Sequence, residues 1–397
     1  MSLRLAVWAM CLTACGGTRT KDAPSTSSTV VILSLDGFRY DYPEKTETPH
    51  IDRIAAEGVR VGRLVPPFPS QTFVGHATLA TGVSPDRHGI LNNKFKSRQR
   101  GPYMMADDVT WYDQVPLWIY AQSKGVRSHV YHWVGSAGSY HGVEPAFWRH
   151  FDKSITDDEK IDTIIGWLEG PEAARPGLVM SYLHGCDHAG HVHGPDSAEV
   201  TACVAEVDAR LGRLMATIEG RSEPITLMVV SDHGMMKTRG IIDVAAHFKS
   251  AMGDAAEVIA VGPVAHVYLK RPEDLATAET AASGLEHVTV HRRGAVPKAL
   301  RYDHPDRTGD LVLVAPFGHR FSHKPLPGHH GHHPDHPEMS AIFFAWGHGV
   351  ARGAEVPLAK SLDLFPTACA LMGLQPPAEV EGKVPEGMLE LPAGISN

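Results

Sequence analysis

Three stretches of six mostly apolar residues each run into polar residues that can bind metal ions. The stretches are residues 30–35, 178–183 and 225–230. Short apolar runs bounded by polar turns predict buried strands. The polar residues that follow them are Asp36, then Asp187 and His191, then Asp232 and His233. Because ligands bind outside the carboxyl ends of the strands in open α/β sheets, we expect the functional site there.

Helical patterns alternate with these strands. Between Asp196 and Glu219, apolar residues recur at three- and four-residue steps, which predicts one amphipathic helix. Further strands are predicted at 129–133, 265–269, 310–315 and 341–345, and a last helix at 362–372. The alternation indicates an α/β fold with a mostly parallel central sheet flanked by helices. Residues 241–327 mix short strands with an Ala-rich helix, and we expect them to form a small inserted subdomain or cap.

Composition places the chain among globular proteins. It has 397 residues, of which 43% are hydrophobic and 21% charged, enough for one large domain or two modest ones. The net charge of -8 gives no basis for binding a nucleic-acid duplex, because that binding relies on basic patches. The 25 histidines point towards metal chemistry, although many lie late in the chain and could be solvated.

The N-terminus has the pattern of a targeting segment. Arg4 supplies positive charge, residues 5–12 are a short apolar stretch, and 12–16 resemble a bacterial lipobox. We therefore expect a lipoprotein signal peptide over 1–15, a flexible tether over 16–28 and a catalytic domain over 29–397. This predicts export to the bacterial periplasm or cell envelope, with membrane contact only through a lipid on Cys15. The alternative is ordinary secretion with Cys15 removed.

Three cysteines remain after that leader: Cys186, Cys203 and Cys369. This odd set allows at most one disulfide and cannot form a disulfide framework. Cys186 stands beside Asp187 and could act as a soft zinc ligand, but a lone cysteine at a strand end is more often a packing residue.

Thr72 is the candidate nucleophile. It lies near the start of a predicted short helix that follows a proline-bounded loop at 69–71. A hydroxyl there is close to the positive end of the helix dipole and to free backbone N–H groups, which favour an alkoxide and an attached phosphate. The alternative is an ordinary N-capping threonine.

The candidate metal ligands are carboxylates and imidazoles. Asp187 and His191 are one helical turn apart, so both can face one ion. Asp232 and His233 are adjacent at a strand end, where the chain leaves the alternation of a strand. Residues 328–337 contain more histidines than one site can use. Mixed Asp and His ligands suit paired zinc or similar divalent ions, which can clamp a phosphoryl group.

These motifs, in this order, resemble the nucleotide pyrophosphatase/phosphodiesterase family of the alkaline phosphatase superfamily. The resemblance covers nearly all of 29–375. Its motifs are Leu35-Asp36-Gly37-Phe38-Arg39, Phe68-Pro69-Ser70-Gln71-Thr72-Phe73, Thr81-Gly82 with Pro85, His88-Gly89-Ile90, Asn93, Asp187 and His191 before Gly194-Pro195, Ser231-Asp232-His233-Gly234-Met235 and Gly328-His329-His330-Gly331.

The resemblance implies a role for each matched residue. Thr72 is expected to be the nucleophile, with Asp36, Thr72, Asp232 and His233 around one zinc. Asp187, His191 and His330 are expected to hold a second zinc. Asn93 and the backbone N–H of Phe73 would contact a phosphoryl oxygen. Phe73, with Phe151 or Trp148, would provide an aromatic surface for the substrate. Gly331 after His330 favours His330 over His329 as the ligand.

The implied function is a two-zinc phosphodiesterase that forms a covalent phospho-threonine on a small-molecule diester. Residues 183–186 are polar where relatives often carry acidic residues and proline, so the leaving-group pocket is expected to differ. A phosphomonoesterase or phospholipid-headgroup hydrolase is the alternative of the same superfamily. A non-catalytic zinc-binding surface lipoprotein is the alternative of another class. Ser84-Pro85-Asp86-Arg87 has the wrong spacing for a sulfatase.

Overall fold

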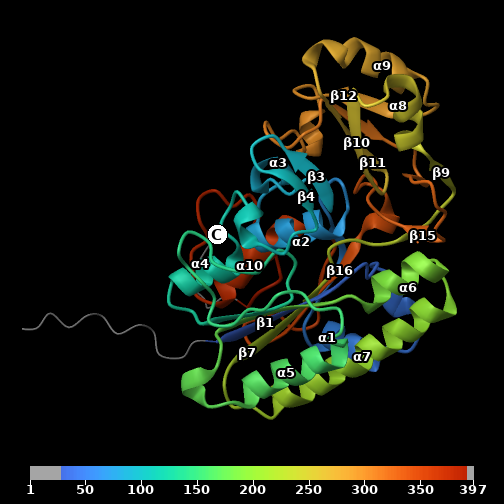
Figure 1. Ribbon diagram of the computed structural model, residues 1–397. Helices are drawn as coiled ribbons and strands as arrows, with labels where there is room; N and C mark the ends of the chain where they lie inside the picture. The colour runs from blue at the N-terminus through green and yellow to red at the C-terminus, as the bar shows by residue number, and fades with distance from the viewer. Residues whose placement is uncertain (1–27, 391–397) are drawn as a thin grey trace, which may run out of the picture.

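A computed structural model of the protein describes residues 28–390. Its centre is an eight-stranded sheet in which β16 alone, among the described strands, runs antiparallel to its neighbours (Figure 1). The predicted mostly parallel α/β sheet is thus confirmed. In spatial order the strands are β17 (Ala354–Val356), β2 (Val59–Val65), β16 (Ala341–Gly347), β7 (Ile225–Val230), β1 (Thr29–Leu35), β6 (Leu178–Leu183) and β5 (Ser128–Tyr131), with β18 (Ala359–Lys360) paired to β2.

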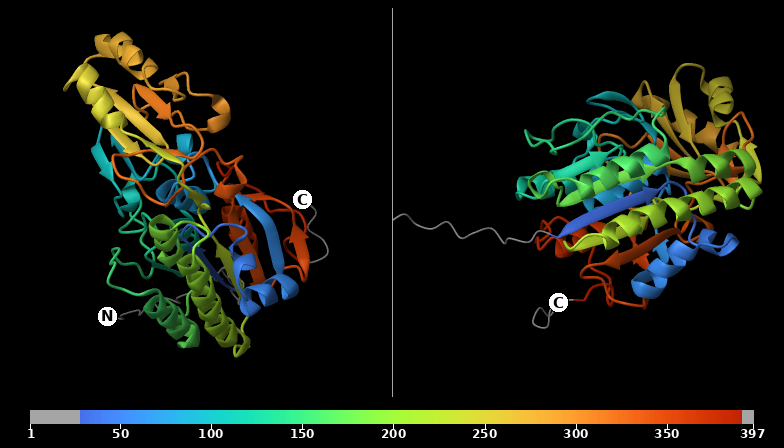
Figure 2. Two further views of the ribbon diagram at one scale, coloured as in Figure 1. Left: turned by 90° about the vertical axis from the view of Figure 1, so that its right-hand side faces the viewer. Right: turned by 90° about the horizontal axis from the view of Figure 1, so that it is seen from below.

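Helices cover both faces of this sheet because its strands are apolar on both sides. In β1, Val30 and Ile32 belong to one core, while Val31 and Leu33 belong to another on the opposite face. Figure 2 shows the long helices of the second face from below. The first core packs against α2 (Thr72–Thr81), α4 (Leu117–Ser123) and α10 (Leu364–Leu371), and the second against α1 (Pro49–Glu57), α5 (Asp157–Glu169) and α7 (Ala198–Glu219).

The register of the central strands brings their ends to one level. Leu35 of β1 pairs with Leu183 of β6, and Ser34 pairs with Val230 of β7, all in parallel. The residues that follow these strands therefore leave the same edge of the sheet. The helix α6 (Gly185–His193) begins two residues after β6 and carries both Asp187 and His191.

A second, four-stranded antiparallel sheet lies beyond that edge, at the top of Figure 1. Its own apolar core includes Val267, Leu311 and Leu313 and is packed against two helices. No helix within residues 28–390 is long and apolar enough to cross a membrane. The elements are β10 (Ala256–Val261), β11 (Val264–Leu269), β13 (Leu311–Val314) and β12 (Thr289–Arg292), with α8 (Val244–Met252) and α9 (Leu275–Ser283).

Short two-stranded ladders complete the fold around the sheet edge. One of them pairs the segment after β7 with the histidine-rich segment, and so places the latter beside the ends of the central strands. The ladders are β3 (Lys94–Ser97) with β4 (Gly101–Met104), β8 (Met236–Lys237) with β15 (Gly328–His329), and β9 (Gly240–Ile242) with β14 (His319–Phe321).

A disulfide joins Cys186 of α6 to Cys203 of α7. The interpretation of Cys186 as a soft metal ligand is therefore wrong: its sulfur is bonded to another sulfur. The single disulfide that the cysteine count allows is formed, and Cys369 is buried and free. The bond ties the helix that carries Asp187 and His191 to the longest helix of the second face.

Removing this disulfide should destabilise the protein. The two cysteines are 17 positions apart in the sequence. A disulfide that closes a loop of this size lowers the entropy of the unfolded chain, and this raises the free energy of unfolding by about 3 kcal/mol. We expect the Cys186→Ser/Cys203→Ser protein to show this loss in chemical denaturation, and to bind metal more weakly because α6 is less restrained. Adding a thiol reductant should shift the wild type towards the double variant and leave the double variant unchanged. An unchanged unfolding midpoint in the double variant would contradict this account.

Candidate active site

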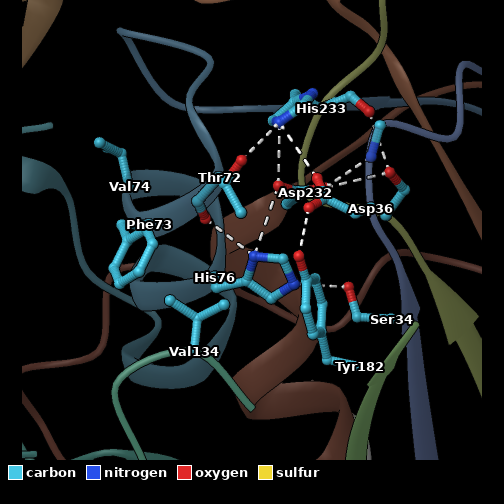
Figure 3. Close-up of polar contacts among 12 residues, drawn as sticks. Ser34, Asp36, Thr72, Phe73, Val74, His76, Val134, Tyr182, Asp232 and His233 are labelled. Carbon is cyan, nitrogen blue, oxygen red and sulfur yellow. Dashed lines mark hydrogen bonds and ion pairs between the residues drawn. The ribbon is translucent and has the colours of Figure 1, made fainter. Parts of the chain in front are cut away.

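Asp36, Asp232 and His233 form the first group of potential metal ligands, at the ends of β1 and β7. All three are buried. His233 Nε2 lies 3.4 Å from Asp36 Oδ1 and 3.1 Å from Asp232 Oδ2. Thr72 Oγ1, from the first residue of α2, lies 3.2 Å from the same nitrogen (Figure 3). Four of the predicted site residues thus meet at one point.

Asp187, His191 and His330 form the second group. His330 Nε2 lies 3.2 Å from His191 Nε2 and 3.6 Å from Asp187 Oδ1, and His191 Nε2 lies 3.5 Å from the same carboxylate oxygen. The two groups adjoin, because the rings of His233 and His330 are stacked with their centroids 3.6 Å apart. His233 also shares a possible ion position with Asp187 and His330.

Each of the three histidines has its other ring nitrogen against a backbone carbonyl. The Nδ1 atoms of His191, His233 and His330 lie 2.9, 2.8 and 2.9 Å from the carbonyl oxygens of Gly328, Gly234 and Ser70. A carbonyl can only accept, so Nδ1 carries the proton in each ring. The Nε2 lone pairs then face the centre of the site, which is the tautomer that a metal ligand needs.

The buried carboxylates fit divalent cations. Asp36 Oδ1, Asp187 Oδ1 and Asp232 Oδ2 have no hydrogen-bond partner within residues 28–390. Burial, together with the charges of Asp232 and Asp187, raises the pKa of Asp36 well above its usual value. Burial is also the main cause that lowers the pKa of His330 well below its usual value, with help from His233 and His191. Cations between these groups would relieve the carboxylate repulsion and use the free lone pairs.

The start of α2 is held close to the end of β7. A Cβ atom on Gly75 would lie 2.6 Å from the backbone oxygen of Asp232, so only glycine allows this approach. Thr72 is the first helical residue, and its hydroxyl contacts His233 rather than capping the helix. The Phe73 N–H donates to Asn93 Oδ1 at 3.0 Å. The two groups expected to contact a phosphoryl oxygen are therefore paired with each other, which leaves the Asn93 amide N–H groups for a ligand.

Comparison with known proteins places this geometry in a family. A family model described as type I phosphodiesterase/nucleotide pyrophosphatase matches residues 30–336. The chain belongs to this family. Membership assigns it to the hydrolases that act on phosphoric esters, which are in general metal-dependent.

Relatives are found in distant organisms. The chain is 29% identical to an uncharacterized pyrophosphatase/phosphodiesterase of Schizosaccharomyces pombe, over 95% of this chain and 83% of that protein. It is 30% identical to an ectonucleotide pyrophosphatase/phosphodiesterase of Caenorhabditis elegans, over 89% of this chain but only 48% of that protein. The chain thus spans about half the length of several of the relatives it matches.

Solved structures of the family share the fold. Murine ectonucleotide pyrophosphatase/phosphodiesterase 5 superposes with a TM-score of 0.82 at 27% identity, covering 88% of this chain and 96% of that one. An inactive form of that protein, with a threonine replaced by alanine, has been solved in complex with AMP. The alkaline phosphatase-like fold expected from the motifs is thus confirmed.

Three polar residues around this family's site were not singled out by the sequence reasoning. Tyr182, at the end of β6, donates its hydroxyl to Asp36 Oδ2 and so leaves Oδ1 facing the site. His76 Nδ1 lies 2.8 Å from the Thr72 carbonyl oxygen, and its Nε2 lies 2.9 Å from Ser34 Oγ. The signal for Ser34 and Tyr182 was a polar side chain within an otherwise apolar strand.

A cavity of about 490 Å³ opens from the ligand cluster. Asp36, Thr72 and Asn93 line its inner end, and Phe73 and Phe151 also line it. Phe151 is 48% exposed. The volume of the cavity lies within the range of pockets that bind ligands larger than a phosphoryl group. The other lining residues are Met104, Met105, Asp107, His132, Trp133, Val134, Gly135, Ser136, Arg149, Tyr182, Asp187, His191 and His330.

The neighbours of His330 are not the solvated histidines that the sequence suggested. His329 and His332 are 1% and 2% exposed. Their Nε2 atoms lie 2.9 Å apart, and His329 Nδ1 lies 2.9 Å from Thr238 Oγ1. For these two histidines the expectation is wrong, because β15 pairs with β8 and places this part of the segment in the interior. His333 and His336, further along, are partly exposed.

Proposed function

We propose that the protein is a two-zinc phosphodiesterase that cleaves nucleotide-type or related diesters through a covalent phospho-threonine at Thr72. One observation carries the proposal: the Thr72 hydroxyl lies 3.2 Å from Nε2 of His233, at the point where two groups of carboxylates and imidazoles meet. The related murine protein supports the proposal, because an inactive form of it, in which a threonine is replaced by alanine, has been solved in complex with AMP.

The Asp and His residues of the site would bind ions, and Thr72 would attack phosphorus. Asp36, Asp232 and His233, with Thr72, would hold one ion, and Asp187, His191 and His330 the other. Bound ions would neutralise the phosphoryl oxygens and the attacking and leaving oxygens. Asp and His ligands with Nε2 lone pairs turned inward suit zinc.

The reaction consists of two displacements at phosphorus. Thr72 Oγ1 loses its proton and bonds to phosphorus, while the bond from phosphorus to the leaving ester oxygen breaks and that oxygen departs as the alcohol. Water then bonds to phosphorus, the bond to Thr72 Oγ1 breaks, and the threonine regains its proton. The balance is one diester and one water giving one monoester and one alcohol. Asn93 would orient a phosphoryl oxygen through its amide N–H groups, and Phe73 and Phe151 would contact the group esterified to phosphorus.

Export is part of the proposal. The pattern of residues 4–16, which lies outside the described residues, favours a lipid anchor at Cys15 and a periplasmic or cell-envelope location. The names of the ectonucleotide relatives support an extracytoplasmic location in a general way. The Cys186–Cys203 disulfide also supports it, since disulfides persist in oxidising compartments.

The diester preference has a direct test. The cavity beyond the ligand cluster offers contacts to a second ester group that a monoester lacks, and binding of such remote groups lowers the barrier. We expect kcat/KM for bis(p-nitrophenyl) phosphate to exceed that for p-nitrophenyl phosphate by at least about tenfold, equivalent to about 1.4 kcal/mol. Metal analysis of the same sample should give two ions per chain. A preference for the monoester would favour the phosphomonoesterase, and activity confined to phospholipids would favour the headgroup hydrolase.

A further inference from the structure

His132 lies at the same edge of the sheet as the metal-ligand cluster but has no role in it. It follows directly after β5, the parallel neighbour of β6. The strand was predicted to extend to residue 133, but the chain leaves the strand conformation at His132, where φ is +60°. His132 lines the cavity beside Phe151, whose ring centroid is 5.4 Å from its own.

The imidazole of His132 is buried without hydrogen bonds. His132 is 2% exposed, and within residues 28–390 neither ring nitrogen has a partner that meets hydrogen-bond distance and angle, although the backbone of His150 lies close by. Buried polar groups are nearly always paired, so an exception at the wall of a cavity points to a ligand as the missing partner. Burial, with the charges of Lys160 and Arg149, lowers the pKa of His132 to about 4. At neutral pH the ring is uncharged and offers one donor and one acceptor.

Two residues of the cavity lining have a strained backbone conformation. Five non-glycine residues within 28–390 have a positive φ, and two of them, Met105 and His132, line the cavity. Such conformations persist where the surrounding structure enforces them, often at ligand sites. Here the surrounding structure fixes the positions of Met105 and of the buried imidazole of His132.

The cavity wall also carries exposed apolar side chains, beside the charged Asp107 and Arg149. Met104, Met105 and Phe151 are 56%, 48% and 48% exposed, and all three line the cavity. Phe151 lies against the His132 ring and is half-exposed. A ligand that fits here needs flat apolar faces to contact the Met and Phe side chains. It also needs hydrogen-bonding atoms at its edge to pair with the His132 ring. A heteroaromatic base has both features, whereas an acyl chain would leave the imidazole unpaired.

We propose that His132 is a specificity-determining residue, whose ring hydrogen-bonds the edge of a heteroaromatic base in the group esterified to phosphorus. This inference rests on the proposed phosphodiesterase function and assigns the part of the same cavity around His132 and Phe151. Discrimination against groups without polar edges follows, because they leave both ring nitrogens unpaired after binding.

The test uses two diesters with the same leaving group. One is p-nitrophenyl thymidine 5′-phosphate, and the other is p-nitrophenyl phenyl phosphate, whose phenyl ring has no hydrogen-bonding edge. In His132→Phe we expect the ratio of the two kcat/KM values to fall by at least about tenfold, the equivalent of one lost hydrogen bond to a buried group. The phenyl ester should change little, and the melting temperature should hold or rise because an unpaired buried polar group is removed. His132→Gln, which keeps a donor and an acceptor, should recover part of the ratio.

His129→Phe is the matched control. His129 is a buried histidine within β5, three residues before His132, and it packs against Trp167 and Phe147 outside the cavity lining. Its Nδ1 is also unpaired among the described residues. Its replacement should leave the ratio unchanged.

A measurement on the wild type alone tests the inference without depending on whether a variant folds. Thymidine 5′-monophosphate should inhibit the wild type more strongly than phenyl phosphate does, and equal inhibition would overturn the inference. An unchanged ratio in folded His132→Phe would overturn it as well, while the phosphodiesterase proposal would stand. If the wild type hydrolysed neither ester, both the phosphodiesterase proposal and the inference about His132 would be wrong.

Discussion

Replacing Thr72 by alanine should lower kcat against bis(p-nitrophenyl) phosphate by at least about 10⁴-fold, the scale seen when an enzyme loses its nucleophile. No other described hydroxyl lies within hydrogen-bond distance of His233 Nε2. The other α2 side chain that reaches the cluster in Figure 3 is His76, whose Nδ1 lies 3.4 Å from Asp232 Oδ2 and which carries no hydroxyl. Metal content should stay close to that of the wild type, because the carboxylates and imidazoles are untouched. Steady-state rates and metal analysis on one sample would measure both.

Two variants bracket that result. Thr72→Ser keeps a hydroxyl and should retain measurable turnover. Thr81→Ala removes a hydroxyl from the last residue of the same helix, where it donates to the Ala77 carbonyl, and should change kcat only slightly. Wild-type turnover in Thr72→Ala would end the covalent mechanism, and loss of metal from it would mean that the threonine is mainly a ligand.

The strands and helices of the central domain were predictable because each is long and strongly patterned. The run at 225–230 coincides with β7, and the helix predicted at 196–219 is α7, which begins at Ala198. Ser197 explains the difference, since its side chain caps the first turn by accepting from the Val200 N–H. Parallel strands that are buried on both faces leave few alternatives for an apolar run of six residues.

The site was predictable only in part. Spacing alone could not bring His330 to Asp187, because their contact joins segments more than 140 residues apart along the chain. The resemblance to a family predicted that His330 and Asp187 bind the same ion. The register of β1, β6 and β7 explains why the ligand residues lie at one edge of the sheet. The contribution of Tyr182 to Asp36 and the burial of His132 depend on side-chain directions at strand ends. A one-residue change in those strand ends would turn either side chain to the other face, so no local pattern determines them.

Asp36→Asn should change stability in opposite directions with and without metal. In the metal-free protein, burial and the charges of Asp232 and Asp187 raise the pKa of Asp36 above its unfolded value. A carboxyl group with a raised folded pKa binds its proton more tightly in the folded state. Its contribution therefore destabilises the fold progressively as pH rises from the ordinary aspartate pKa through the raised one. At neutral pH, metal-free Asp36→Asn should melt at a higher temperature than the metal-free wild type.

With zinc the order should reverse. An ion present at about 1,000 times its Kd stabilises the folded state by about 4 kcal/mol, and the amide loses most of that gain because it lacks the carboxylate charge. We expect the metal affinity of Asp36→Asn to be at least about 100-fold lower than that of the wild type, and kcat/KM to fall with it. Mutating a residue that only hydrogen-bonds a metal ligand already lowers metal affinity about 10- to 100-fold. Thermal unfolding of chelator-treated and zinc-loaded samples at neutral pH, with metal analysis, measures both effects.

Asp208→Asn is the matched control for this sign change. Asp208 is a buried carboxylate of α7 that belongs to neither ligand group, and it accepts hydrogen bonds from the backbone N–H groups of His50 and Ile51. An amide accepts these bonds more weakly than a carboxylate, so its replacement should lower the melting temperature by a similar amount in both samples and leave the metal content unchanged. If Asp36→Asn behaved in the same way, its carboxylate would be a structural group rather than a metal ligand.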